Sequence, residues 1–274
     1  MNYYKGRNNL ACTIFIPVKC GNNCPFCNTN SMYEGFELKD EYIEKILNAI
    51  DIANNSKVIS EFVITGGEPL FNLEILKKII NKIEKNVYIN TSLPNIPNID
   101  ECIDYINNED KIKGINISRH IANKHNIKVC NNEKFNNIKK YIRINCIIKE
   151  EYLNQEGLLK SFIDAYATPY IMINFRADYR YVTTDTLKNR DNIEKWLLTN
   201  YHWEYTTSCL VCNSEFFSDN DYKVICYHRG LENSRVTYGN NSYINDVLID
   251  MYGNIYSDWD MIQDDKFIEW LKNN

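Results

Sequence analysis

The sequence contains no stretch of about 18 consecutive apolar residues, the length that a helix needs to cross a bilayer. The apolar segment 11–18 is short and leads into a cysteine cluster without a small-residue cleavage site, so it does not predict a signal peptide. No internal repeat, low-complexity tract or flexible linker interrupts the chain. These absences predict a cytoplasmic protein with no membrane partner.

The chain also lacks an excess of positive charge, since 31 lysines and arginines against 36 aspartates and glutamates give a formal net charge of −5. A broad electrostatic grip on nucleic acid or on an anionic membrane needs the opposite sign. An extended nucleic acid is therefore not an expected partner, whereas a single nucleotide in a local basic pocket remains compatible with this composition. At 274 residues, the chain is long enough to bury a sizeable core in one or two domains.

Short β-rich apolar runs alternate with helical patterns along the first 200 residues. Strands are predicted at 11–18, 61–65, 87–91, 114–118, 142–148 and 170–175, and helices at 40–54, 73–84, 100–107, 133–140, 157–167 and 189–200. This alternation predicts a parallel sheet with helices packed outside it. Because a full barrel has eight such units, the six units predict an α/β fold, a partial (β/α)6 barrel.

The pattern changes near residue 201, where the spacing becomes irregular and a second group of cysteines occurs. Residues 247–250 and 254–256 flank a three-residue turn and predict a small hairpin. The sequence thus predicts two parts, a barrel over residues 1–200 and a small cysteine-containing extension over residues 201–274 that packs on the barrel.

Three of the ten cysteines, Cys20, Cys24 and Cys27, lie within eight residues and directly follow the first predicted strand. Thiolates at this density suit an iron–sulfur cluster or zinc, but zinc sites usually draw four ligands from paired CxxC units. A cubane held by three cysteines leaves one iron open to bind a small chelating substrate. The spacing therefore favours an iron–sulfur cluster.

A second motif, Thr65-Gly66-Gly67-Glu68-Pro69, follows the second predicted strand. Its glycines let the backbone approach a ligand closely, and its carbonyls and the Glu68 side chain can accept hydrogen bonds from an ammonium group. A cysteine loop with C-x3-C-x2-C spacing, followed about 40 residues later by GGEP, resembles the radical S-adenosylmethionine (SAM) superfamily.

This resemblance implies a [4Fe–4S] cluster on the three cysteines, with SAM bound at the open iron and a reductant such as flavodoxin or ferredoxin as partner. One electron from the cluster would cleave SAM to a 5′-deoxyadenosyl radical. The resemblance further implies that Phe26 lies near the adenine and that Gly66, Gly67 and Glu68 contact the amino group of SAM.

Polar residues on the later strands are further candidates for contact with SAM. In similar enzymes, groups in the positions of Thr91, Ser118 and Asn145 contact the carboxylate or ribose of SAM. The alternatives are a turn for Thr91 and a helix N-cap for Ser118.

Arginines on or just after the last predicted strands are the candidate substrate contacts, namely Arg143, Arg176 and Arg180. Arginine suits bidentate recognition of a phosphate or a carboxylate, so this set favours a small anionic substrate such as a nucleotide. Surface solvation or salt bridging is the alternative interpretation for each of them.

The second cysteine group comprises Cys209, Cys212 and Cys226. Its spacing resembles the second cluster-binding segment of the molybdenum cofactor biosynthesis cyclases, within the auxiliary-cluster (SPASM/twitch-like) branch, and implies a second [4Fe–4S] cluster near the substrate. A Cys3His zinc site that includes His228, or no metal at all, are the alternatives. The chain ends in EWLKNN without the glycine-rich, arginine-bearing tail of those cyclases, so cyclisation of GTP is not expected.

Taken together, the motifs predict a radical SAM enzyme that removes a hydrogen atom from a small molecule or a nucleotide. Modification of a ribosomally made peptide is an alternative, although the 19 residues before Cys20 are too few for a leader-recognition domain. A non-catalytic metal-binding or redox-sensing protein is the other alternative, and it would have no need of GGEP.

Overall fold

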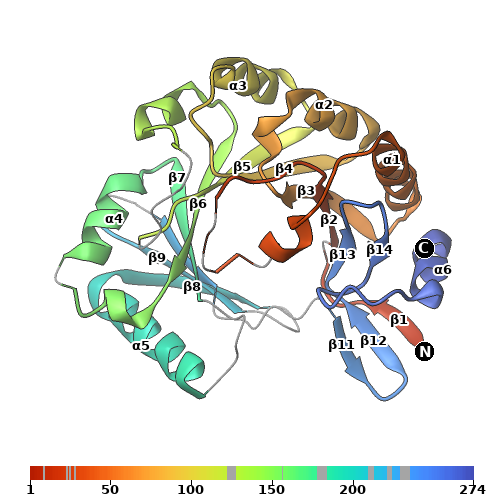
Figure 1. The fold of residues 1–274 in the computed structure, drawn as a ribbon. Coiled ribbons are helices and arrows are strands. Elements are labelled where there is room, and N and C mark those ends of the chain that lie inside the picture. The colour runs from red at the N-terminus through yellow and green to blue at the C-terminus, as the bar shows by residue number, and fades with distance from the viewer. Residues whose placement is uncertain are drawn as a thin grey trace.

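Six β-rich segments form neighbouring parallel strands in the order in which they occur in the chain (Figure 1). The computed structural model describes residues 1–8, 10–22, 24, 26–27, 29–121, 128–155, 157–177, 184–208, 213–220, 224–228 and 235–274. The six strands are β2 (Leu10–Ile16), β3 (Ile59–Gly66), β4 (Asn86–Thr91), β5 (Ile112–Ser118), β6 (Tyr141–Ile148) and β7 (Ile171–Ala177). The predicted α/β fold with a largely parallel, barrel-like sheet is confirmed.

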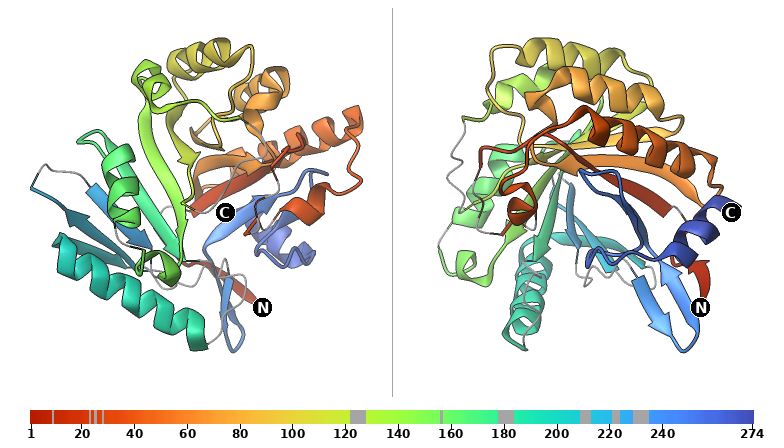
Figure 2. Two further views of the ribbon diagram at one scale, coloured as in Figure 1. Left: turned by 60° about the vertical axis from the view of Figure 1, so that its left-hand side comes forward. Right: turned by 45° about the vertical axis from the view of Figure 1, so that its right-hand side comes forward.

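Helices cover the outer side of this curved sheet (Figure 2). They are α1 (Asp40–Asn55), α2 (Leu73–Lys82), α3 (Ile99–Asn108), α4 (Leu158–Tyr166), α5 (Thr184–Asn200) and α6 (Asp265–Asn273). In α1, Ile43, Ile46 and Ile50 recur at helical spacing and are all buried, which explains why this segment packs as an amphipathic helix. Among the described residues, no helix combines the length and the apolarity that crossing a membrane would require.

The helix predicted over residues 133–140 is wrong. The chain instead forms a short 3-10 helix, η3 (Asn132–Asn137), and then extends into β6. The segment reads NEKFNN, and asparagine side chains compete for backbone hydrogen bonds, so they favour turns over an α-helical interior.

The second part of the chain extends the same sheet at both edges. Next to β7 lie β10 (Val224–His228), parallel to β7, then β9 (Asn213–Ser218) and β8 (His202–Ser208). Next to β2 lie β13 (Asp246–Ile249), parallel to β2, and β14 (Ile255–Tyr256), which pairs with β13 in the predicted hairpin. The division into residues 1–200 and 201–274 stays a prediction.

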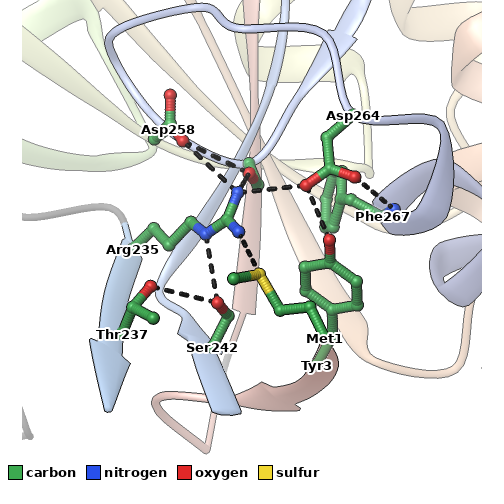
Figure 3. Close-up of polar contacts among 9 residues, drawn as sticks. Met1, Tyr3, Arg235, Thr237, Ser242, Asp258, Asp264 and Phe267 are labelled. Atoms are coloured by element: carbon green, nitrogen blue, oxygen red, sulfur yellow. Dashed lines mark hydrogen bonds and ion pairs between the residues drawn. The ribbon is translucent and has the colours of Figure 1, made fainter. Parts of the chain in front are cut away.

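A separate three-stranded sheet joins the two ends of the chain, and it consists of β1 (Asn2–Lys5), β12 (Asn241–Ile244) and β11 (Arg235–Tyr238). Arg235 connects this sheet to the start of α6 (Figure 3). Its guanidinium donates to Ser242 Oγ at 3.3 Å, to Ser257 Oγ at 3.1 Å and to Asp264 Oδ2 at 3.1 Å. Tyr3 donates its hydroxyl to the same carboxylate oxygen at 2.6 Å, so one aspartate holds both termini.

Three lysines at the amino ends of successive strands cap the carboxyl ends of the neighbouring helices. Lys85, Lys111 and Lys140 directly precede β4, β5 and β6. Lys85 Nζ donates to the carbonyls of Ala53 and Ser56 at the end of α1 and to that of Ile59, which follows. Lys111 Nζ donates to the carbonyls of Ile80, Asn81 and Ile83 at the end of α2. Lys140 Nζ donates to the carbonyl of Glu109 at the end of α3, and all these distances are 2.7–3.2 Å. A cation there satisfies orphan carbonyls and complements the helix dipole.

Candidate functional site

A cavity of about 590 Å³ lies at the carboxyl ends of β2 to β5, where the strands of a parallel α/β sheet usually present a ligand site. It brings together the cysteine loop, the GGEP turn and the polar ends of β4 and β5. The predicted site residues that line it are Cys20, Cys24, Phe26, Cys27, Gly66, Gly67, Glu68, Thr91 and Ser118. Elements separated by about 100 residues of sequence therefore share one chamber.

The three loop cysteines are half-buried and form no disulfide. The backbone N–H of Cys27 donates to the carbonyl of Cys24 at 3.0 Å, and the N–H of Asn22 donates to Cys20 Sγ at 3.4 Å. Burial raises the pKa of the Cys20 thiol to about 11. Among the described residues, no three histidine, cysteine or carboxylate side chains converge closely enough to ligate one metal ion, so the thiols share a chamber without being gathered at one point.

The glycine pair lets the GGEP turn lie directly against the strand and loop that lead to Cys20. Gly66 has a φ of +101°, a conformation that other residues rarely adopt. A Cβ atom on Gly67 would lie 1.6 Å from the carbonyl oxygen of Val18. The hydroxyl of Tyr33 donates to the carbonyl of Ile16 at 2.7 Å and occupies the space beside Gly66, where a Cβ would meet it.

Glu68 is 1% exposed, and both of its carboxylate oxygens are already engaged. Oε1 accepts from the hydroxyl of Thr91 at 2.5 Å and from the N–H of Leu70 at 3.2 Å, while Oε2 accepts from the N–H and the hydroxyl of Ser92 at 2.7 and 2.5 Å. Burial raises the pKa of Glu68, and these hydrogen bonds oppose the rise. The carboxylate therefore fastens the turn to the end of β4.

The backbone just after β4 forms a turn that brings Thr91 and Ser92 to the Glu68 carboxylate. Leu93 is buried with a φ of +47°, and its N–H donates to Thr91 Oγ1 at 2.9 Å. The hydroxyl of Thr91 thus donates to one neighbour and accepts from another. Thr91 lines the cavity, and its hydroxyl supports Glu68, whereas its predicted contact with SAM stays a prediction.

Phe26 and His120 stand at the boundary of this first cavity. Their ring centroids are 4.3 Å apart and the planes are inclined by 60°, an edge-to-face contact. Nδ1 of His120 accepts a hydrogen bond from the N–H of Ile147 on β6 at 3.0 Å, so a neutral imidazole carries its proton on Nε2. The cysteine loop is in this way braced against the barrel wall.

A second cavity of about 490 Å³ occupies the interior of the barrel. It contains the predicted substrate residues Arg143 and Arg176, together with Asn145, which the sequence assigned to SAM. The two cavities share the lining residues Phe26, Thr29, Thr65, Asn90, Ser118 and His120, and are therefore adjacent. Arg180 lies outside the described residues.

Asparagines on adjacent strands form an amide row across the interior, comprising Asn90, Asn116, Asn145 and Asn174. Asn116 donates to Asn90 at 2.7 Å, Asn90 donates to Thr65 Oγ1 at 3.3 Å, and Asn174 donates to Asn145 at 3.0 Å. Only the prediction for Asn145 came from the sequence. The other three asparagines alternate with apolar residues along their strands, and this period of two is visible in the sequence.

An ion pair lies in the wall of the second cavity, between Arg7 and Asp246, whose side chains meet at 2.6 Å. Burial raises the pKa of Asp246, and Arg7 opposes the rise. Burial, followed by the charges of Arg176, Arg143 and Arg7, lowers the pKa of His228 to about 3, so its imidazole is neutral at pH 7. The local sequence gave no signal for this ion pair, which depends on the parallel pairing of β13 with β2.

Of the second cysteine group, Cys209 and Cys212 lie outside the described residues. Cys226 is buried on β10, where it pairs in register with Asn174 of the amide row. Burial raises the pKa of its thiol. His228 lies two residues further along the same strand, and the hydroxyl of Ser214 is 2.9 Å from its Nδ1.

Comparisons with known proteins identify the family that the chain resembles. Residues 14–146 match the family model of the radical SAM superfamily. A segment is 30% identical over 92 residues to the radical SAM cyclopropyl synthase TigE of Paramaledivibacter caminithermalis, and the match covers 28% of this chain and 19% of that protein. The matched segment thus spans about a fifth of the length of that relative.

Two solved structures are similar in part. One is a histidine-tagged anSMEcpe with bound AdoMet, with a TM-score of 0.48 and 15% identity, covering 70% of this chain and 61% of the other. SuiB of Streptococcus suis has a TM-score of 0.48 and 16% identity, covering 70% of this chain and 47% of the other.

Proposed function

We propose that this chain, which carries a radical SAM domain over residues 14–146, reductively cleaves SAM and uses the resulting 5′-deoxyadenosyl radical to remove a hydrogen atom from a small molecule. The observation that carries the proposal is the adjacency of two cavities. One is lined by the three thiols and the GGEP turn, and the other is a polar chamber inside the barrel. A radical formed in the first has a direct route to a molecule held in the second.

The donor set supports a cluster on Cys20, Cys24 and Cys27. These soft sulfur ligands line one chamber, and Gly66 and Gly67 of the neighbouring turn line it with them. When bound, a [4Fe–4S] cluster supplies the electron that breaks the sulfonium bond of SAM. The chain itself holds the cofactor, orients it and excludes water.

Several residues would orient SAM in the first cavity. Gly66 and Gly67 line this cavity and would offer backbone groups to SAM, and Glu68 keeps the turn in place through its bonds to the end of β4. Phe26 offers an aromatic face at the boundary with the second cavity, and Ser118 lines both chambers. Fixing both reactants at this boundary is the main rate advantage that the fold can provide.

The test is anaerobic reconstitution followed by reduction with dithionite, with 5′-deoxyadenosine measured by mass spectrometry. Wild-type protein is expected to form it, and Cys24→Ala is expected to form none. Cys130→Ala is the matched control, because Cys130 is a buried thiol that does not line the cavity. Failure of the reconstituted wild type to produce 5′-deoxyadenosine would overturn the proposal.

A second cluster on Cys209, Cys212 and Cys226 is part of this proposal. It is supported by the position of Cys226 beside Asn174, which lines the barrel chamber. Iron analysis of reconstituted protein should give about eight irons per chain for two cubanes and about four for one. Zinc in place of the additional iron would favour the Cys3His alternative with His228.

Ring closure is a second candidate for the outcome of hydrogen abstraction, because the matching relative is a cyclopropyl synthase. Closing a carbon–carbon bond within one molecule removes two hydrogen atoms and adds nothing. The 5′-deoxyadenosyl radical would take one of them, and the other would leave as a proton and an electron, with an oxidised iron–sulfur cluster as the electron acceptor. Mass spectrometry of extracts incubated with the active enzyme would separate the two outcomes. A product lighter by two hydrogens favours ring closure, and any other mass change excludes it.

A further inference from the structure

Arg143 lies near the amino end of its strand in the barrel wall. It lies on β6, in register with Asn116 on β5 and Met172 on β7, and lines the second cavity. Its guanidinium carbon stands 5.9 Å from the ring centroid of Tyr141, which holds the side chain along the strand. Its Nε is shielded from solvent and has no hydrogen-bond partner among the described residues. A buried N–H donor without an acceptor is unfavourable, and an oxyanion in the cavity would satisfy it.

The charge balance of the cavity favours the same ligand. Three arginines line it against two carboxylates, Glu61 and Asp246. Within this set Arg7 and Asp246 form an ion pair at 2.6 Å, and the lining as a whole carries more positive than negative charge. Arg143 and Arg176 line one chamber from the paired strands β6 and β7, with Arg176 in register with Ile147, so positive charge lies along this side of the barrel.

The surroundings of Arg143 limit what else the ligand contains. Asn145 lies two residues further along the same face of β6 and accepts from Asn174, which leaves its own amide N–H groups to donate. Asn116 lies opposite Arg143 and donates to Asn90, which leaves its carbonyl oxygen as an acceptor. A neutral row of donors and acceptors beside a cation suits a compact polar molecule with one anionic end. A volume of about 490 Å³ is that of a small-molecule pocket.

We infer that the barrel chamber is an oxyanion-binding site, in which Arg143, assisted by Arg176, binds the carboxylate or phosphate group of a small polar molecule. Asn116 and Asn145 would contact the polar groups next to that anion. The inference rests on the proposed function only in naming this molecule as the substrate, because the binding itself needs no SAM. The end of the molecule remote from the anion would face the boundary formed by Ser118 and His120.

Isothermal titration of the reconstituted full-length chain tests the inference, with ribose 5-phosphate as the phosphate probe and succinate as the carboxylate probe. At least one probe is expected to bind the wild type, and the one that binds identifies the anion. Arg143→Gln is expected to weaken that binding about tenfold, as the loss of a charge-assisted bidentate contact predicts. Arg190→Gln, on α5 and outside the cavity, is the matched control and should leave binding within about twofold.

Arg143→Lys keeps the charge without the planar fork and should give an intermediate affinity. It also serves as the test variant should Arg143→Gln fail to fold. Binding of neither probe to the wild type, or equal affinity in all variants, would overturn the inference. Formation of 5′-deoxyadenosine by the wild type is measured in parallel, so anion binding without SAM cleavage would remove the proposed function and leave the oxyanion site standing.

Discussion

Replacement of Glu68 by glutamine tests whether this carboxylate supports the glycine turn or contacts the cofactor. Glutamine keeps the shape but places an NH2 group where one oxygen accepted two hydrogen bonds. The hydroxyl of Thr91 can rotate and accept from that NH2, whereas the N–H of Leu70 would face another donor. If the amide turns over, the N–H of Ser92 meets the same conflict.

The size of the effect follows from these bonds. One buried N–H left unsatisfied costs about 1–3 kcal/mol, and losing the charge on the remaining acceptor weakens its bonds by roughly 1 kcal/mol. The neutral side chain avoids the burial penalty that raises the pKa of Glu68, which offsets part of the loss. We therefore expect Glu68→Gln to lower the free energy of unfolding by about 1–3 kcal/mol.

Urea unfolding followed by circular dichroism, with and without SAM, measures this loss. Because the four bonds lie within the chain, the loss should be present when SAM is absent. Glu74→Gln is the control, since the Glu74 side chain is 79% exposed on α2 and its removal should change stability by less than about 0.5 kcal/mol. Unchanged stability without SAM, combined with weaker SAM binding, would refute the supporting role and make Glu68 a direct contact.

Three further changes have expected outcomes. Gly67→Ala places a Cβ against the carbonyl of Val18 and should lower the thermal midpoint by the equivalent of roughly 1–3 kcal/mol; an unchanged midpoint would contradict the close approach. Tyr3→Phe should cost about 1 kcal/mol and move acid unfolding to higher pH. Although burial raises the pKa of Asp264, hydrogen bonds from Tyr3, a backbone N–H and an arginine bring it below the usual value of about 3.9. The stabilisation that Asp264 provides is therefore present above the usual carboxyl pKa and is lost as the pH falls through the folded pKa. Identical acid-unfolding curves for the wild type and Tyr3→Phe would disprove the contact. Lys85→Met removes the donor to three carbonyls near the end of α1 and should cost about 1–3 kcal/mol while SAM affinity stays constant; a loss of affinity would argue against a purely structural role.

The barrel was predictable because each of its strands carries its own signal. The prediction of 114–118 corresponds to β5 at Ile112–Ser118, where apolar residues bounded by turn residues determine the element locally. The parallel pairing of β13 with β2 could not be found in this way, since it joins residues more than 200 positions apart and no local pattern encodes a partner. The helix prediction for residues 133–140 failed because the segment has only a weak helical pattern of apolar residues, and its asparagine side chains favour turns.

The candidate site was also predictable only where its residues form a local sequence motif. The cysteine loop and GGEP are contiguous motifs whose chemistry is readable from residue type and spacing. The supporting role of Glu68 was not readable, because it depends on the end of β4 reaching the turn through Ser92. Similarly, the sequence identified Arg143 by its charge, while its buried Nε and its neighbour Asn116 became visible only when the strands were placed in register.

The lysines before β4, β5 and β6 have a consequence for how the barrel comes apart. Each ties the amino end of one strand to the end of a helix in the adjoining unit, at the opposite end of the sheet from the first cavity. Unfolding of one strand–helix unit therefore removes the lysine that caps the helix of its neighbour, so neighbouring units lose stability together. We therefore expect neighbouring strand–helix units to unfold together, and this cooperativity would let the polar chamber hold an unsatisfied atom such as Nε of Arg143.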